Sequence, residues 1–162
     1  MTVKFTALRD SYPTEDRDAF FTDVLQGSWS KLKDEENYKN TCALRMSVAL
    51  NRTGVAIPDA VWSSDGKFSA GDGSRLLAKV LSMLKLLDAT FGDPWGMSKK
   101  AGVPFDLAKN VPKWTGVLAY RFPEKLAQAR GHVDLWDGTS CHFDCPAPDT
   151  DAAFDIALWR LP

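Results

Sequence analysis

The spacing of apolar residues changes between the two halves of this chain. In residues 15–26 and 74–87 apolar side chains recur at helical intervals, which is typical of helices that pack on one side. The second half has strand-like patterns in four runs, over residues 115–122, 131–136, 141–144 and 154–161. Helices first and strands second predict an α+β domain, with helices packed on one face of an antiparallel sheet of about four strands.

Other segments of the first half carry shorter signals. Residues 3–8 predict a short strand, and residues 54–73 have the glycine and proline content of an irregular connection. Ser74 is expected to cap the helix that follows it. Residues 42–50 are apolar on more than one face and are followed by Gly54, so they predict a central helix that packs on several sides.

Length and charge restrict the class of protein. A chain of 162 residues, 44% hydrophobic and 25% charged, suits a single domain over residues 1–162 with a sizeable core. Its 20 basic and 21 acidic residues give a net charge of -1, which argues against nucleic acid as a partner and favours a small or neutral substrate. The apolar runs are too short for membrane insertion, and residues 1–10 lack the apolar core of a secretory signal, so synthesis in the cytoplasm is expected.

Cys42 lies at the start of the predicted central helix. Asn40 or Thr41 can cap that helix by accepting a hydrogen bond from an unpaired amide of its first turn. The free N–H groups and the positive end of the helix dipole favour a thiolate at this position, and the same amides can bind a developing oxyanion. Cys42 is therefore a candidate nucleophile. The alternative is a structural cysteine, since free cysteines are among the most buried residues.

The other two cysteines, Cys141 and Cys145, are close enough in sequence to form a disulfide, which would leave Cys42 unpaired. A zinc site built from Cys141, His142 and Cys145 is an alternative. It has three ligands at an awkward spacing and lacks a second pair of ligands. We therefore expect no metal.

The chain has only two histidines, His132 and His142, and they flank an Asp137-Gly138 turn. Such a dipeptide between strand-like runs predicts a β-hairpin. The register of the hairpin then decides which residues meet across it. A two-residue loop would pair His132 with Phe143.

A three-residue loop of residues 137–139 would instead pair His132 with Asp144 and Asp134 with His142. Cross-strand neighbours lie ~5 Å apart at Cβ, close enough for a carboxylate to hold an imidazole in one tautomer. His132 is then a candidate general base and Asp144 the residue that orients it. Asp134 is a rival for the orienting role, because it lies two residues from His132 on the same strand face.

These motifs resemble a known family, the type VI secretion amidase effectors of family 4, which are papain-like peptidoglycan amidases. The resemblance rests on residues 40–51 (Asn-Thr-Cys-Ala-Leu-Arg-Met-Ser-Val-Ala-Leu-Asn), on residues 131–138 (Gly-His-Val-Asp-Leu-Trp-Asp-Gly) and on the cysteines at 141 and 145. The order of the motifs and the total length also fit. The resemblance therefore covers essentially the whole chain.

The resemblance implies a papain-like fold and a cysteine amidase that needs no cofactor. Carried over by position, Cys42 is the nucleophile and His132 is the general base and acid. The third family residue is an aspartate inside the loop between the two cysteines, where Asp144 is the only acid. This chain departs from the family in having Phe143 at the midpoint of that loop.

The resemblance also implies a setting. Such effectors pass, without a signal peptide, from the donor cytoplasm through the type VI secretion machinery into the periplasm of a rival Gram-negative cell. There they cut the amide bond between D-glutamate and meso-diaminopimelate in peptidoglycan stem peptides. A dedicated immunity protein occludes the cleft in the producer's lineage. A disulfide between Cys141 and Cys145, as in family members, can form in the oxidising periplasm.

Two other functions are compatible with the same residues. A papain-like site can transfer the acyl group to an amine instead of to water. From another class, the chain can be a non-catalytic binding domain whose cysteines are structural or bind zinc. The nature of the new termini on peptidoglycan and the zinc content of the protein distinguish these functions.

Overall fold

The structure is a computed structural model that describes residues 2–122, 131–144 and 152–162. Its helices are α1 (Phe5–Ser11), α2 (Arg17–Ala19) continued by a π-helical segment (Phe20–Leu25), two 3-10 helices (Gly27–Lys31 and Glu36–Tyr38), α3 (Cys42–Arg52), α4 (Asp59–Asp65), α5 (Val80–Phe91) and α6 (Leu107–Asn110). Its strands are β1 (Phe68–Ser69), β2 (Arg75–Leu76), β3 (Trp95–Lys99), β4 (Gly116–Arg121), β5 (Gly131–Trp136) and β6 (Phe154–Arg160).

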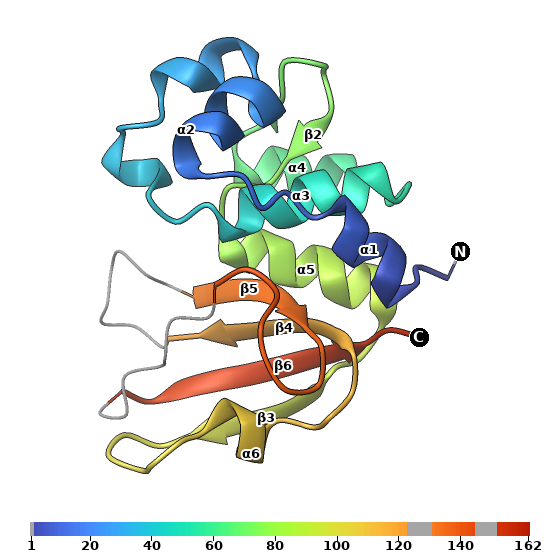
Figure 1. Ribbon diagram of the computed structural model, residues 1–162, viewed down its shortest axis with the longest axis vertical. Helices are drawn as coiled ribbons and strands as arrows, with labels where there is room; N and C mark the ends of the chain where they lie inside the picture. Colours follow the sequence, from blue (N-terminus) through green and yellow to red (C-terminus); the bar gives the residue numbers. More distant parts are fainter. Residues whose placement is uncertain (1, 123–130, 145–151) are drawn as a thin grey trace.

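The main sheet has four antiparallel strands in the order β3-β6-β4-β5, and helices precede it in the chain (Figure 1). The predicted α+β class is therefore confirmed. One of the four predicted strands is wrong, because within residues 141–144 only Cys141 forms a bridge, to Trp136. The fourth strand is β3, which is not among the strands predicted from the sequence. Its partner β6 is about sixty residues further along the chain, so local sequence carried little sign of the pairing.

Two local predictions in the first half are also wrong. Residues 3–8 lead into helix α1 and not a strand, since Phe5 and Leu8 are both buried and a spacing of three residues places them on one helical face. The helix expected from Ser74 begins only at Val80, because Arg75–Leu76 pairs with β1. The expected irregular connection also contains a short helix, α4.

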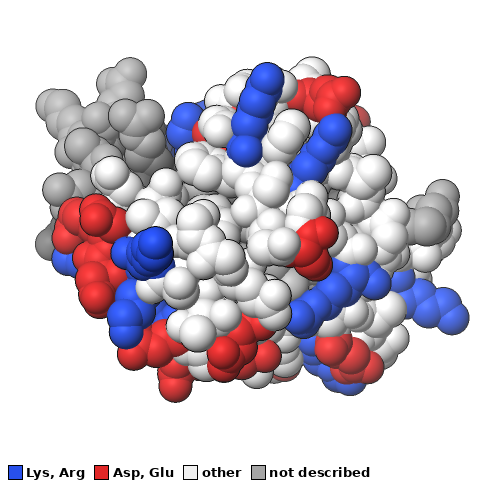
Figure 2. All heavy atoms as spheres, turned by 90° about the horizontal axis from the view of Figure 1, so that it is seen from above, with Lys and Arg blue, Asp and Glu red and all other residues white. Residues whose placement is uncertain are grey.

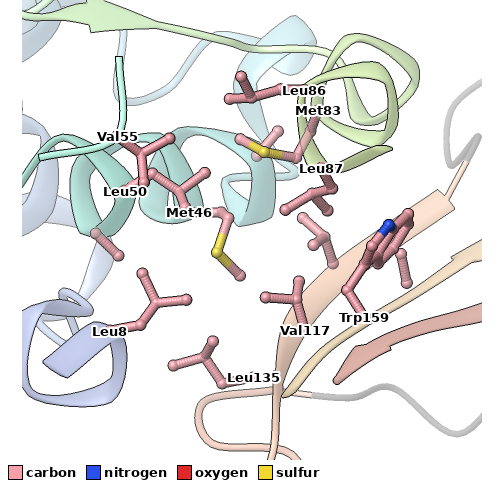
Figure 3. Close-up of a cluster of buried hydrophobic side chains, with 14 of the residues drawn as sticks. Leu8, Met46, Leu50, Val55, Met83, Leu86, Leu87, Val117, Leu135 and Trp159 are labelled. Carbon is pink, nitrogen blue, oxygen red and sulfur yellow. The ribbon is translucent and has the colours of Figure 1, made fainter. Parts of the chain in front are cut away.

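Helices α3 and α5 both lie against β5, and α5 also contacts β6 (Figure 1). Their apolar side chains meet those of α1 and of the sheet in one core. In Figure 3 side chains from all these elements point into the same space, among them Leu8, Met46, Leu50, Met83, Leu86, Leu87, Val117, Leu135 and Trp159. This packing holds the start of α3 beside the outer strand of the sheet.

The sheet is buried on its other face as well. Val117 and Ala119 face the helices, whereas Leu118 and Tyr120 belong to a second cluster on the far side. The chain between β3 and β4, which includes α6, contributes to that second cluster. Two-sided burial explains why β4 is a continuous apolar run, while an antiparallel strand with one solvated face would alternate.

Charges of both signs are scattered over the surface seen in Figure 2, with uncharged areas between them. This distribution agrees with the near-zero net charge of the chain. Within the described residues, no helix is both long enough and apolar enough to span a membrane.

The packing of α5 leads to a stability prediction. Leu87 is completely buried in the main core, whereas Leu81 of the same helix is 38% exposed. We expect Leu87→Ala to lower the free energy of unfolding by about 2–5 kcal/mol, because it leaves a cavity between helix and sheet. Leu81→Ala, the matched control, should change it by less than about 1 kcal/mol. Urea unfolding of both variants measures the difference, and equal losses would contradict the described packing.

Candidate active site

Helix α3 begins at Cys42, as the sequence predicts, and places this residue where the helix meets the sheet. Cys42 is a free cysteine and is only 6% exposed. Of the two candidate caps, Asn40 forms the bond: its Oδ1 accepts a hydrogen bond from the Cys42 N–H at 3.2 Å. Thr41 makes no side-chain capping bond. The predicted oxyanion donor is therefore already engaged by Asn40 in this structure.

Asn40 also connects the helix to strand β5. Its Nδ2 donates a hydrogen bond to the Gly131 carbonyl oxygen at 3.1 Å, and Gly131 directly precedes His132. On the other side of His132, the backbone N–H of Val133 is hydrogen-bonded to the Cys42 thiol. The two residues that flank His132 thus both bind the segment that carries Cys42.

Burial determines the charge state of the thiol. It raises the pKa of Cys42 from its ordinary value of 9.0 to about 12, although hydrogen bonds from the backbone of Val133 and Ala43 and from the Asn40 side chain lower it. The expectation of a thiolate at the helix N-terminus is therefore wrong for the free protein. The helix end and its N–H groups favour the anion, but desolvation of a buried charge costs more.

His132 lies on β5 opposite Tyr120 of β4, and the two ring centroids are 5.3 Å apart. Burial lowers the pKa of His132, whereas the charge of Asp144 and a hydrogen bond with the Asp144 backbone raise it. Burial has the larger effect, so the imidazole is neutral at pH 7. Its Nε2 is buried and has no hydrogen-bond partner among the described residues.

The hairpin after β5 has neither of the two predicted registers. Trp136 pairs with Cys141, which leaves a four-residue connection over 137–140, and the His142 N–H donates to the Leu135 carbonyl oxygen at 2.9 Å. The Asp137 carboxylate accepts hydrogen bonds from the N–H groups of residues 139 and 140. These bonds stabilise a turn longer than an Asp-Gly dipeptide suggests.

The two rival aspartates have different roles in this register. Asp144 is exposed, and its charge acts on His132. Asp134 is completely buried and accepts hydrogen bonds from the N–H groups of Leu135 at 2.7 Å, Phe143 at 3.0 Å and Asp144 at 2.8 Å. Burial raises the pKa of Asp134 and these bonds lower it. The expected pairing of Asp134 with His142 is replaced by these backbone contacts.

Cys145 lies outside the described residues, so the Cys141–Cys145 disulfide and the zinc alternative both stay untested predictions. In the part of the chain that the structure describes, no group of three or more His, Cys, Asp and Glu residues is arranged to hold a metal ion.

Arg45 belongs to the site and was missed by sequence reasoning. It is 2% exposed, its Nε donates to Thr41 Oγ1 and its Nη1 to the Pro13 carbonyl oxygen, both at 3.0 Å. The guanidinium lies over the rings of Phe20 at 4.2 Å and Phe143 at 4.3 Å. A single charge in the otherwise apolar run after Cys42 was the available signal, because a buried cation needs a set of acceptors.

Tyr12 was also missed, and no local pattern marks it. Its ring meets His142 edge-on, with the centroids 5.7 Å apart, and lies 6.2 Å from Phe143. Burial raises the pKa of Tyr12 well above its ordinary value, with further contributions from the charges of Asp134 and Cys42. The Tyr12 side chain thus lies among the candidate catalytic groups.

Comparison with known proteins identifies one family. The family model described as type VI secretion system (T6SS), amidase effector protein 4 (Tae4) matches residues 38–159. No curated protein matches this sequence.

Several solved structures are similar over the full length. Tae4 in the effector-immunity complex Tae4-Tai4 from Enterobacter cloacae is 24% identical, with a TM-score of 0.78 and 100% coverage of both chains. Tae4 of Enterobacter cloacae in another structure is 22% identical, with a TM-score of 0.78 and coverage of 100% of this chain and 98% of that chain. Tae4 from Salmonella typhimurium, in complex with Tai4 from Enterobacter cloacae, is 24% identical, with a TM-score of 0.77 and coverage of 98% and 99%. The α+β fold of this chain is the fold of these structures.

The buried thiol leads to a pH prediction. Between the ordinary pKa of 9.0 and about 12, the native protein keeps the Cys42 proton that the unfolded chain loses. The rate of Cys42 alkylation by iodoacetamide should therefore rise about tenfold per pH unit from pH 7 to 10 in the native protein. In urea-unfolded protein it should level off above pH 9. Mass spectrometry of the Cys42 peptide gives both rates, and a native rate that levels off below pH 8 would show a thiolate instead.

Proposed function

The chain belongs to the type VI secretion system amidase effector protein 4 family, and we propose that it is a cysteine amidase with Cys42 as nucleophile. One observation carries this proposal: the thiol and its helix N-terminus bind the backbone on both sides of His132. The His132 ring in turn is hydrogen-bonded to the backbone of Asp144 and lies in the field of its charge. Amide hydrolysis by a cysteine nucleophile uses three such groups: the nucleophile, a base, and an acid behind the base.

In the proposed reaction the thiol proton moves to Nε2 of His132 while Sγ of Cys42 bonds to the substrate carbonyl carbon. The carbonyl oxygen becomes an oxyanion. When the intermediate collapses, the C–N bond breaks and the leaving amine takes the proton from His132. Water then attacks the acyl-enzyme and gives a proton to His132, and the thiol regains its proton as the acid product leaves. Every proton passes between Cys42, His132, water and substrate, so no cofactor is required.

The charge states of the free protein support general-base activation. A buried neutral thiol and a neutral imidazole can exchange one proton during the attack, without a separated ion pair in the resting site. The unpartnered Nε2 is free to accept that proton. Asp144 then stabilises the imidazolium that forms.

The Cys42 N–H is the proposed oxyanion donor. It is held by Asn40 at 3.2 Å, the long end of the range for an N–H···O bond. An oxyanion is a stronger acceptor than a neutral amide oxygen. During attack the Cys42 N–H would therefore release the Asn40 oxygen and bind the oxyanion, and this stronger bond favours the transition state over the free enzyme.

We further propose that the substrate is the amide bond between D-glutamate and meso-diaminopimelate in peptidoglycan stem peptides, cut in the periplasm of a rival cell. The Enterobacter cloacae and Salmonella typhimurium structures contain Tae4 with the immunity protein Tai4. By analogy, this chain would have a cognate immunity protein that covers the active site. Hydrolysis gives new free termini, whereas acyl transfer would attach an amine to them.

The two histidines provide a direct test of the mechanism. On purified peptidoglycan we expect Cys42→Ala and His132→Ala to lose at least about a thousandfold in activity. His142→Ala is the matched control, because His142 is exposed in the same hairpin and should keep activity within about threefold. Mass spectrometry of the released peptides measures the rate and identifies the bond. A Cys42→Ala variant that still lyses cells when directed to the periplasm would refute the proposal.

Asn40 allows a second test, of how the helix is held against the strand. Asn40→Ala removes both of its hydrogen bonds, so kcat/KM should fall by about 10- to 100-fold while the fold persists. Asn51→Ala at the far end of α3 removes a similar amide bond, from Asn51 Nδ2 to the Arg75 carbonyl oxygen. It should lose stability without loss of kcat/KM below the unfolding temperature. Equal activity in the two variants would mean that Asn40 does not position Cys42.

A further inference from the structure

The carboxylate of Asp134 is buried next to the segment that carries Asp144. It lies on β5, two residues after His132, and is 0% exposed. Among the described residues its hydrogen-bond donors are all backbone N–H groups, those of Leu135, Phe143 and Asp144. A buried carboxylate is costly unless its oxygens are satisfied, and two of these three donors belong to the segment that carries Asp144.

Among the described residues, two other backbone contacts support that segment. The ladder beyond β5 consists of the Trp136–Cys141 bridge and the hydrogen bond from the His142 N–H to the Leu135 carbonyl oxygen. Past His142 no described residue continues the ladder, and Oδ2 of Asp134 takes its place by binding two successive N–H groups. This oxygen therefore helps to fix the position of the Asp144 backbone, which is hydrogen-bonded to the His132 ring.

Side-chain contacts of Phe143 fix the direction of the segment. The Phe143 ring stacks on the Arg45 guanidinium at 4.3 Å and lies beside Tyr12, with the ring centroids 6.2 Å apart. Phe143 is thus directed towards the N-terminal half of the protein, and Asp144 is left to act on His132. Both the backbone and the neighbouring side chain hold Asp144 in place.

We propose that Asp134 is a positioning residue, whose carboxylate clamps the backbone of residues 143–144 and so places Asp144 against His132. This role rests on the proposed function. It differs from direct orientation of the histidine, because Asp134 would act only through Asp144. The carboxylate is needed in its ionised form, since its oxygens accept three N–H bonds and a protonated oxygen would accept fewer.

A double-mutant cycle separates the two roles. Asp134→Asn replaces the carboxylate with an amide, which puts either its NH₂ group or its weaker oxygen acceptor at the position where Oδ2 accepts two N–H groups. Asp144→Ala removes the acid behind His132. We expect each variant to lose about 10- to 100-fold in kcat/KM. The double variant should be within about twofold of Asp144→Ala, because residues that act through one another are not additive. Losses that multiply, or an unaffected Asp134→Asn, would overturn the proposal.

A readout besides activity comes from the two histidines. In Asp134→Asn the pKa of His132, followed by side-chain NMR, should fall as it does in Asp144→Ala, since the raising effect of Asp144 is lost. His142 serves as a second signal in the same spectra. Asp65→Asn is the matched control: Asp65 is 1% exposed and accepts the N–H groups of Ala78 and Lys79. That variant should lose stability and leave the His132 pKa unchanged.

The unmodified protein provides a test that does not depend on a variant that folds. The amide hydrogens of Phe143 and Asp144 should exchange at least tenfold more slowly than that of Thr139, which is bonded to the exposed Asp137. Fast exchange at both residues would overturn the clamp. Hydrogen exchange and NMR do not depend on catalysis. An active Cys42→Ala variant would refute the proposed function and leave the exchange and NMR results unchanged, so the two failures can be distinguished.

Discussion

The outer edge of strand β5 is the constraint on which the candidate site depends. β5 is the last strand of the sheet, so its outward-facing backbone groups have no neighbouring strand to bind. The site supplies the partners. Asn40 binds the Gly131 oxygen, and the Cys42 thiol binds the Val133 N–H. Leu135 donates its N–H to the Asp134 carboxylate and accepts the His142 N–H at its carbonyl oxygen. Each of these bonds closes part of a sheet edge, and the first two bind the segment that carries Cys42 to the residues on either side of His132.

Burial then determines the chemistry of these groups. The same packing that holds α3 against the sheet desolvates the Cys42 thiol and the His132 ring, and it favours the neutral form of both. A resting site without an ion pair is compatible with the apolar core beneath it. Charge would develop only during attack, when the oxyanion and the imidazolium form close to donors and acceptors that are already in place.

Two polar side chains connect the parts of the site that the core does not. Asn40 joins α3 to the strand through one donor and one acceptor. Asp134 joins the strand to the segment after the hairpin through acceptors alone. Arg45 completes the arrangement from the helix side, with its cation on the Phe143 ring. Phe143 faces Arg45, and the charge of Asp144, one position later, raises the pKa of His132.

The sequence alone was sufficient for the fold class, the family and the helix that begins at Cys42, because each depends on a local pattern of apolar or motif residues. It left the cap open between Asn40 and Thr41, and the structure selects Asn40. The identity of the fourth strand, the hairpin register and the charge state of the thiol depended on tertiary structure. Strand β3 is defined by a partner distant in the chain, the register by the way Asp137 binds the loop backbone, and the thiol pKa by desolvation in a core built from several elements. Local spacing cannot report such effects, since each is a property of groups that only the folded chain brings together.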